Sequence, residues 1–393
     1  MDKLTVNELF SGIGAQRKAF ERLGIPHEVV GICEIDKYAI QSYEAIFGKT
    51  KNYGDICTVT RLDYADLWTY SFPCQDISVA GNQEGINENT RSGLLYQVQR
   101  LLEVAKVEGT LPKYLLLENV KNLVGKKFKS QFDNWLFYLD QLGYDTYWQV
   151  LNAKNYGIPQ NRERVFAVSI RKDLKQKYEF PKAKPLTKKL ADILEDEVDE
   201  KYYLSEKCIQ GFLKYNENHE AKGTGFLWKP RDPNSHASCL RANGALAPTD
   251  NTIVVENKIQ QVEGNLYPNS GNPQAGRVYK PEGISPALDT CQGGNRMPKI
   301  ILDDTQGFDG LRTYENYSPT LRACRSGLKT VDGLRIRKLT PLECWRLMGF
   351  DDEDFYKAQQ SGVSDTQLYK QAGNSIVVNV LEKIFKNLYK EVN

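Results

Sequence analysis

The stretch Ser71-Phe72-Pro73-Cys74-Gln75 decides how the rest of the chain is interpreted. It follows the apolar run 65–70, which predicts a buried strand, and it opens a polar, glycine-rich loop. In an open α/β sheet, ligands bind beyond the carboxyl ends of the strands, so a nucleophile at this position faces a crevice. A free cysteine more often packs as an inert buried side chain. The rigid proline before Cys74 and the long polar loop after it favour a catalytic role over packing.

Composition limits the class of protein. The chain has 393 residues, 40% hydrophobic and 26% charged, which is long enough for two domains with a sizeable core. No apolar run approaches the ~18 residues of a membrane span, and residues 1–4 lack signal-peptide features, so we expect a cytoplasmic protein without membrane association. Eight cysteines without a Cys-x-x-Cys pair and only three histidines argue against a zinc site and a disulfide framework.

The charge of the chain does not by itself indicate a nucleic-acid partner. Formal net charge is +2, so any DNA-binding surface depends on local segregation of charge. Such segregation exists between Arg312 and Lys338, where seven basic residues stand against two acidic ones.

The N-terminal region predicts a ligand-binding strand, turn and helix at 4–10, 11–14 and 15–23. Its glycines let the backbone approach a ligand at the helix N-terminus. A dinucleotide fingerprint needs a third glycine where Arg17 stands, which disfavours a hydride-transfer enzyme. Glu34 ends a second strand roughly twenty residues beyond the turn, where an acid can grip a ribose. Asp36 instead suits the cap of a helix over 37–47.

Two further strand ends carry polar side chains. A strand is predicted over 114–120, in which Glu118 and Asn119 follow the apolar residues 114–117, and a buried glutamate needs a partner. Arg162 and Arg164 precede another apolar strand, and an i, i+2 spacing turns both to one face of extended chain. Taken alone, each of these polar residues could be an ordinary surface side chain. Together with Cys74 they mark one edge of the sheet as a site.

The amino-acid composition changes beyond about residue 180. The acidic run 192–200 predicts a linker with a solvated helix, and the glycine- and asparagine-rich region 223–334 predicts a β-rich domain. An imperfect repeat occurs at 237–241, 285–289 and 318–322. It indicates either similar hairpins or loops that present arginines to phosphates and base edges. Near the C-terminus, Thr340, Pro341 and Glu343 predict a capped helix start.

In this order the motifs resemble those of the C5-cytosine-specific DNA methyltransferases of bacterial or phage type, over nearly the whole chain. The resemblance implies an α/β fold with a doubly wound mixed sheet of the Rossmann-like methyltransferase kind, and a second, smaller, β-rich target-recognition domain. The implied domains are a catalytic and cofactor-binding domain at 1–185, a target-recognition domain and hinge at 186–371, and a returning segment at 372–393.

The resemblance also implies S-adenosyl-L-methionine as cofactor, leaving as S-adenosyl-L-homocysteine, and no metal. Its motifs assign cofactor binding to Phe10, Gly12, Ile13, Gly14, Glu34, Ile35, Asp55, Ile56, Pro73, Asn374 and Ser375. They assign catalysis to Cys74, Glu118, Arg162 and Arg164, and we expect Arg162 to support the Cys74 thiolate. We expect DNA contacts from Ser78, Gln83, Arg91, Arg241, Arg296, Arg322 and Arg325.

The activity implied is methylation of cytosine C5 in a specific short sequence of double-stranded DNA, with base flipping and covalent cysteine catalysis. We expect a monomer; a cognate restriction endonuclease would act on the same site without a stable complex. The alternatives are the same chemistry on tRNA, or a catalytically silent DNA-binding homologue. The intact set of Cys74, Glu118 and Arg164 disfavours the silent homologue, and the long, hairpin-rich second domain favours DNA over tRNA.

Overall fold

The computed structural model describes residues 3–73, 91–222, 227–242, 247–248, 250–256, 261–265, 277–279, 299–302, 312–313 and 334–389. The chain forms two compact units. Unit 1 comprises Met1–Glu197, Asn234–Asn251 and Leu339–Asn393, and unit 2 comprises Val198–Pro233 and Thr252–Lys338. Residues 186–197, 234–251 and 339–371, which the sequence assigns to the second domain, lie in unit 1, and the functional roles of the domains stay a prediction.

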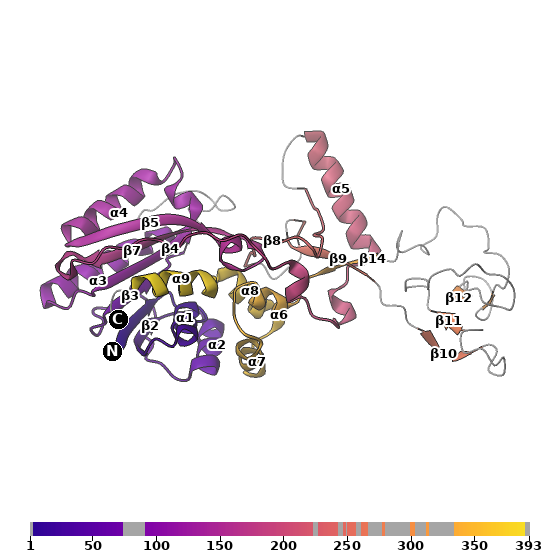
Figure 1. The fold of residues 1–393 in the computed structure, drawn as a ribbon, viewed down its shortest axis with the longest axis horizontal. Coiled ribbons are helices and arrows are strands. Elements are labelled where there is room, and N and C mark those ends of the chain that lie inside the picture. The colour runs from indigo at the N-terminus through magenta and orange to yellow at the C-terminus, as the bar shows by residue number, and fades with distance from the viewer. Residues whose placement is uncertain are drawn as a thin grey trace. The chain divides into compact units, whose positions relative to one another are not determined.

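Unit 1 is built on a six-stranded sheet with the order β2-β1-β3-β4-β7-β5 (Figure 1). Its strands are β1 (Leu4–Leu9), β2 (His27–Cys33), β3 (Leu67–Tyr70), β4 (Tyr114–Val120), β5 (Tyr144–Asn152) and β7 (Glu163–Arg171). The strands β1 to β4 pair in parallel, and β7 is antiparallel to both β4 and β5. The predicted doubly wound mixed sheet is therefore confirmed. Strand order reverses at β1, so the crevice beyond β1 and β3 is the position where such sheets bind ligands.

Helices cover both faces of this sheet. On one face, α3 (Leu95–Glu108) and α4 (Lys129–Gln141) share a buried core with Leu115 and Leu117 of β4. On the opposite face, α1 (Ala15–Leu23) packs on α9 (Val378–Leu388), where the rings of Phe20 and Phe385 stack 4.1 Å apart. Tyr114, which alternates with Leu115 along the pleated strand, contacts the ring of Tyr389 just beyond α9. The N-terminal and C-terminal ends of the chain thus form one layer.

Several elements lie where the sequence predicts them. The helices α1 and α2 (Lys37–Phe47) and the strand β4 have the predicted bounds. The predicted helix over 192–200 is wrong, because only the short 3₁₀ turns Leu190–Ile193 and Glu200–Tyr202 form there. Tertiary bonds hold this run in place instead: the Glu195 N–H donates to Glu343 Oε1 at 2.9 Å, and Arg346 donates to the Ile193 carbonyl at 3.0 Å.

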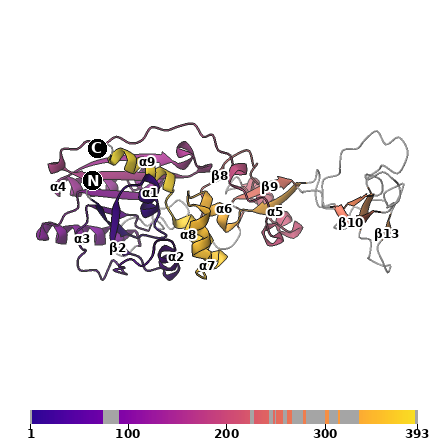
Figure 2. The ribbon, with the colours of Figure 1, turned by 60° about the horizontal axis from the view of Figure 1, so that its bottom comes forward.

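The C-terminal helices of unit 1 are α6 (Pro341–Arg346), α7 (Asp352–Gln360) and α8 (Asp365–Asn374). The predicted capping box of α6 is confirmed: the Glu343 N–H donates to Thr340 Oγ1, and the Thr340 N–H donates to Glu343 Oε2 at 2.8 Å. Lys18 of α1 lies 2.8 Å from both Asp351 and Asp354 at the start of α7. Figure 2 shows α6, α7 and α8 together, and these bonds join them to the N-terminal half of the sheet.

Residues 234–251 also belong to unit 1, although both flanking segments belong to unit 2. The strand β8 (Ala237–Ser238) pairs in parallel with β6 (Gln160–Asn161), directly before β7. The first copy of the sequence repeat, 237–241, is therefore a part of unit 1. The second and third copies, 285–289 and 318–322, lie outside the described residues.

Unit 2 contains the helix α5 (Glu206–Lys222) and two small sheets. The strands β9 (Thr252–Glu256) and β14 (Leu334–Lys338) pair antiparallel, although they lie far apart in the sequence. The other sheet has the order β10 (Gln261–Asn265), β11 (Arg277–Tyr279), β12 (Lys299–Leu302) and β13 (Arg312–Thr313). The predicted β-rich character is confirmed for the described part of this unit.

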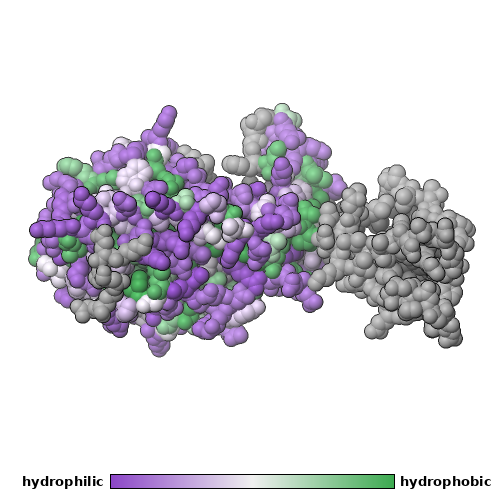
Figure 3. Space-filling model, viewed as in Figure 1, coloured by the Kyte–Doolittle hydropathy of each residue, from purple (hydrophilic) through white to green (hydrophobic). Residues whose placement is uncertain are grey.

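The exposed surface of unit 1 is mainly polar on the face seen in Figure 3, with hydrophobic residues in small groups. In the part of the chain that the structure describes, no helix combines the length and apolarity required to cross a bilayer.

Candidate active site

A cavity of about 610 Å³ lies at the carboxyl edge of the sheet, a volume suited to a small organic ligand. The segments following β1, β2, β3 and β4 line it, together with the end of α8. It brings together thirteen of the residues predicted from sequence: Phe10, Gly12, Ile13, Glu34, Ile35, Asp55, Ile56, Pro73, Glu118, Arg162, Arg164, Asn374 and Ser375. Predicted cofactor and catalytic side chains thus share one chamber.

The glycine turn forms one wall of this cavity. Phe10 has a positive φ of 59°, rare for a side chain of this size, and Gly12 follows with φ 55°. The N–H groups of Phe10 and Ser11 both donate to the Cys33 carbonyl, which fixes the turn against β2. A Cβ at Gly12 would meet nothing within 4 Å, so a ligand can approach its backbone.

Gly14 is not among the residues that line the cavity, and its role in cofactor binding stays a prediction. A Cβ there would come within 2.5 Å of the Phe47 ring and 2.7 Å of the Tyr43 ring. Its φ of 77° also favours glycine at the start of α1. Gly14 therefore allows α1 and α2 to pack closely, and it contributes to the cavity only through the position of the turn.

Glu34 organises the turn after β2. Its Oε2 accepts from the Gly12 N–H at 2.9 Å, and its Oε1 accepts from the Ile35 and Asp36 N–H groups, both at 2.9 Å. A carboxylate has about four lone-pair sites, so three backbone donors leave capacity for a ligand hydroxyl. Asp36 accepts from the Tyr38 and Ala39 N–H groups, which confirms its predicted role as the cap of α2.

The part of the cavity wall beside Glu34 combines apolar and polar groups. Ile35 lines the cavity and is 73% exposed, so it offers an apolar surface to a ligand. Asn52 joins the two adjoining loops: its Oδ1 accepts from the Glu34 and Gly54 N–H groups, and its Nδ2 donates to the Glu34 carbonyl. No sequence pattern indicated Asn52, because its role arises only from the turn geometry that brings 52–56 beside β2.

Glu118 lies at the opposite end of the cavity. It is 6% exposed, and Arg164 Nε lies 3.3 Å from its Oε1. The Ser71 hydroxyl donates to Glu118 Oε2, and the Asn119 amide donates to the Phe72 carbonyl at 3.0 Å. These contacts give the buried glutamate the partner that its position requires. They also join the end of β4 to the segment that leads to Cys74.

Comparison with known proteins decides the family. The sequence profile described as C-5 cytosine-specific DNA methylase matches residues 4–390. This chain belongs to that family. It is a DNA (cytosine-5) methyltransferase. Over an alignment of 465 positions, gaps included, it is 35% identical to the orphan methyltransferase M.SPBetaI of Bacillus phage SPbeta, with 99% of this chain and 98% of that protein covered. It is 33% identical to the type II methyltransferase M2.ScrFI of Lactococcus lactis subsp. cremoris, with 98% and 99% covered.

The fold of this methyltransferase is also similar to a solved structure, that of the Dnmt2 methyltransferase of S. pombe. The TM-score is 0.64 at 20% sequence identity, and each chain is covered completely. At this identity the likeness concerns the fold, and it agrees with the mixed sheet of unit 1.

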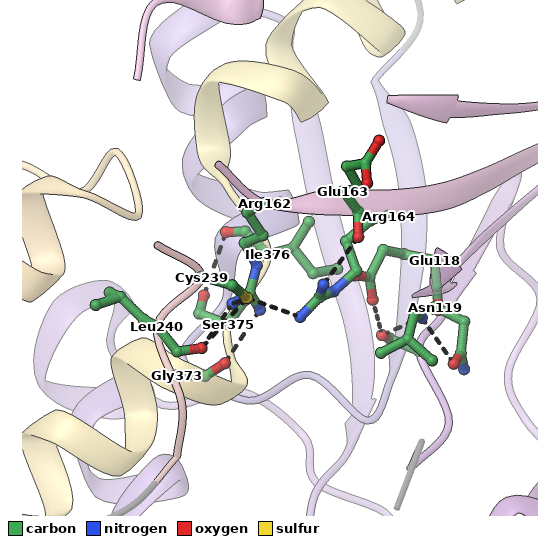
Figure 4. A network of polar contacts seen from close by, with 12 residues as sticks. Glu118, Asn119, Arg162, Glu163, Arg164, Cys239, Leu240, Gly373, Ser375 and Ile376 are labelled. Carbon is green, nitrogen blue, oxygen red and sulfur yellow. Dashed lines mark hydrogen bonds and ion pairs between the residues drawn. The ribbon is translucent and has the colours of Figure 1, made fainter. Parts of the chain in front are cut away.

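The arginine pair of the methyltransferase is part of a buried polar network (Figure 4). Arg162 is 3% exposed, and its Nη2 donates to the Gly373 carbonyl at 3.0 Å and to the Ser375 carbonyl at 2.7 Å. Its Nη1 donates to the Leu240 carbonyl at 3.2 Å and lies 3.4 Å from Cys239 Sγ. Arg162 thus joins three segments of the chain. The predicted contact between Arg162 and the Cys74 thiolate stays a prediction.

Gly373 allows this network to close. A Cβ on Gly373 would come within 2.4 Å of the Arg241 carbonyl carbon and 2.5 Å of the Ala242 nitrogen. The backbone of α8 therefore lies directly against the 237–242 segment. Asn374 and Ser375 follow at the cavity, as the late sequence motif predicts.

The remaining predicted residues divide into two groups. Cys74, Ser78, Gln83, Arg296, Arg322 and Arg325 lie outside the described residues, and only the backbone of Arg91 is described, in the 3₁₀ turn Arg91–Leu94. Arg241 is described, and its Nε lies 3.3 Å from Asp250 Oδ1 within unit 1. Arg241 belongs to unit 1, and its predicted contact with DNA stays a prediction.

Sequence reasoning missed two further side chains at this site. Lys370 lines the cavity, and its Nζ lies 2.6 Å from Asp36 Oδ2. Burial raises the pKa of Asp36, but hydrogen bonds from Lys370 and from the Tyr38 N–H outweigh burial and hold that pKa below its usual value. Cys239 contacts both arginines. Neither residue carries a local signal, because each reaches the site across a long sequence separation.

Proposed function

We propose that this protein transfers a methyl group from S-adenosyl-L-methionine to C5 of a cytosine in a specific short sequence of double-stranded DNA. The observation that carries this proposal is the single cavity lined at one end by the glycine turn and Glu34, and at the other by Glu118 and Arg164. A chamber of this kind can hold a nucleoside-bearing cofactor and a pyrimidine side by side.

The residues around the glycine turn fit the cofactor. Glu34 keeps acceptor capacity for ribose hydroxyls, the open side of Gly12 admits a ligand, and Ile35 offers an apolar surface to a base. S-adenosyl-L-methionine, when bound, supplies an electrophilic methyl group on a positively charged sulfur. Lys370 and Asn374 line the same cavity from α8, so the C-terminal helices help to enclose it.

The chain's own residues make cytosine reactive. C5 of the aromatic ring is a weak nucleophile, so the Cys74 thiolate adds to C6 and opens the C5=C6 double bond. Glu118 then hydrogen-bonds N3 and Arg164 holds O2, which stabilises the negative charge that develops on the ring. After C5 takes the methyl group, a base removes the C5 proton. The electron pair re-forms the double bond, and the Cys74 thiolate leaves.

This chemistry requires the target base to leave the duplex. C6 is inaccessible in a stacked base pair, and extruding the base costs a few kcal/mol that contacts in the pocket must recover. Glu118 is 6% exposed, so a base can reach it only by entering the cavity. We therefore infer base flipping, with double-stranded DNA as the partner and a monomer as the active form.

The biological setting follows from the relatives' names. M2.ScrFI is called a type II methyltransferase, and M.SPBetaI an orphan methyltransferase. A type II role would make the protein one half of a restriction-modification pair, with the endonuclease acting on the same DNA site without a stable complex. An orphan role would need no such partner.

The test is expression in a bacterial host without cytosine methylation of its own, followed by bisulfite sequencing of its DNA. We expect 5-methylcytosine in one short sequence. Cys74→Ser should abolish the modification, because a hydroxyl without an adjacent base is not a nucleophile at neutral pH. Cys208→Ser, in α5 of unit 2, is the matched control and should methylate normally. Methylation by Cys74→Ser within about tenfold of wild type would refute the covalent mechanism.

A further inference from the structure

The sulfur of Cys239 lies between two guanidinium groups. Its Sγ is 3.4 Å from Arg162 Nη1 and 3.6 Å from Arg164 Nη2, both within hydrogen-bonding range for sulfur. Arg164 in turn pairs with Glu118 at 3.3 Å. Figure 4 shows Cys239 at the centre of this chain of contacts, between the side chains of Arg162 and Arg164.

Two amide side chains fix the backbone on either side of Cys239. Gln160 is 0% exposed, and its Oε1 accepts from the Leu240 N–H at 3.1 Å while its Nε2 donates to the Leu347 carbonyl at 2.8 Å. Asn251 is 8% exposed and bonds the Ser238 N–H at 2.8 Å and the Ser238 carbonyl at 3.1 Å. Both flanking residues are therefore held, so the sulfur has a defined position.

In the part of the chain that the structure describes, Arg162 contacts the sulfur of Cys239 without a carboxylate partner of its own. Arg162 donates its four Nη protons to three carbonyl oxygens and to sulfur, and none to a carboxylate among the described residues. Figure 4 shows the adjacent Glu163 carboxylate pointing away from Arg162, and Glu163 pairs with Lys121 at 3.0 Å. Arg162 is thus a buried cation whose described partners are neutral oxygens and the sulfur of Cys239. A buried charge is costly unless it is paired, and a thiolate on Cys239 would pair with Arg162.

We propose that Cys239 is a positioning residue for methyl transfer: its anionic sulfur holds Arg162 and Arg164 together, so that Arg164 keeps its ion pair with Glu118. The proposal rests on the proposed function, because Arg164 and Glu118 act on the cytosine there. Cys239 is not among the residues that line the cavity, so it acts on the cytosine only through the two arginines. It is a second essential cysteine with a role distinct from that of Cys74.

The electrostatics of the site agree with this geometry. Burial raises the pKa of the Cys239 thiol, but the charges of Arg162 and Arg164 and their hydrogen bonds outweigh burial, and the pKa lies below its usual value. Cys33 provides the contrast, since burial and the nearby Glu34 and Asp55 carboxylates raise its pKa to about 12. Only Cys239 of these two cysteines lies in surroundings that favour a thiolate.

The experiment compares Cys239→Ala, Cys239→Ser and Cys239→Asp in single-turnover methylation of a duplex that the wild-type protein methylates. We expect the alanine and serine variants to lose about 10- to 100-fold in rate, because each removes an anionic acceptor from two charged donors. The aspartate variant restores a negative charge and should recover most of the rate. Affinity for S-adenosyl-L-homocysteine, measured by titration calorimetry, should stay within about twofold of wild type. Cys208→Ser is again the control.

Each other outcome has a definite meaning. A serine variant as fast as wild type would show that no anion is needed at this position and would overturn the proposal. An alanine variant with the full wild-type rate would also overturn the proposal. Loss of S-adenosyl-L-homocysteine binding in all three variants would overturn it too, because the role of Cys239 would then be purely structural. If the wild-type protein makes no 5-methylcytosine at all, the proposed function fails before the Cys239 variants are compared.

Discussion

Replacing Gly373 by alanine tests the packing that closes the active site. Gly373 lies in α8, where alanine is ordinarily the better helix former by about 1 kcal/mol. At this position, however, the new Cβ would lie within 2.4 Å of the Arg241 carbonyl carbon and 2.5 Å of the Ala242 nitrogen. These atoms are backbone and cannot rotate away. We therefore expect the sign of the usual effect to be reversed.

The magnitude follows from two opposing contributions. Forcing an extra carbon into a packed interior costs about 1–3 kcal/mol. The facing segment is held by the bonds of Leu240 to Gln160 and Arg162, which limit how far it can relax. Because the facing segment can relax little, we take the upper half of that range, about 2–3 kcal/mol, and subtracting the helix-propensity gain of about 1 kcal/mol leaves a net loss of stability of about 1–2 kcal/mol. Because Arg162 bonds the Gly373 carbonyl, the rate of methylation should fall as well.

Hydrogen exchange read by peptide mass spectrometry measures this change locally. Peptides from α8 and from 237–242 should exchange faster in Gly373→Ala than in wild type. The matched control is Gly211→Ala in α5, where a Cβ meets nothing within 4 Å and the same substitution should slow exchange. If Gly373→Ala is as stable as wild type, or more stable as helix propensity alone predicts, the close-packing argument is wrong.

Two other predictions concern single carboxylates. Glu34→Ala should weaken S-adenosyl-L-homocysteine binding by about 10- to 100-fold in titration calorimetry, because the charged acceptor is lost, whereas Glu28→Ala, at an exposed ion pair, should not. Unchanged affinity would remove Glu34 from the site. Burial raises the pKa of Glu8 from 4.5 to about 7, although Tyr43 donates to it and Arg17 lies near. Folded protein therefore keeps this proton between pH 4.5 and 7 while unfolded protein loses it, so stability should fall by about 3 kcal/mol across that window. The stability of Glu8→Gln, measured by denaturation across this pH range, should not show this fall. A pH profile of stability identical to that of wild type would contradict the prediction.

The Glu8 prediction bears on the cofactor site because of where this carboxyl lies. Glu8 is fully buried in β1, and the Tyr43 hydroxyl donates to its Oε2 at 2.7 Å. Tyr43 is also one of the two rings against which Gly14 packs. Glu8 is thus connected to the glycine turn through Tyr43, and a change in the charge of Glu8 should alter the support of that turn.

Local sequence was sufficient to predict several helices and strands, and to predict which side chains meet at the carboxyl edge of the sheet. The bounds of α1, α2 and β4 and the capping box of α6 are set by residues within a few positions of each other, so they can be predicted from short windows. The grouping of Glu34, Glu118 and Arg164 in one cavity also follows, because the ends of adjacent strands in such a sheet converge.

The sequence was insufficient wherever distant segments pack. Residues 237–241 resemble the later repeats, which predict either hairpins or DNA-reading loops, yet they pair with β6 and contact Arg162, which lies 77 residues before Cys239 in the chain. The acidic run 192–200 has a helical composition, but bonds to Glu343 and Arg346 hold most of it in an irregular path. In both cases a local preference of a few tenths of a kcal/mol is overridden by buried polar contacts worth about 1 kcal/mol or more each.

The site itself shows the same division. The sequence by itself predicted which side chains carry the chemistry, since the proposed nucleophile, acid and arginine each stand at a recognisable strand end. Only the tertiary structure decided what holds them: Cys239 between the arginines, Ser71 on Glu118, and Gly373 against Arg241. Reactive groups are constrained by chemistry and so appear as patterns in sequence. Their supports are constrained by distance and charge in the folded chain, which many residue types and positions can satisfy.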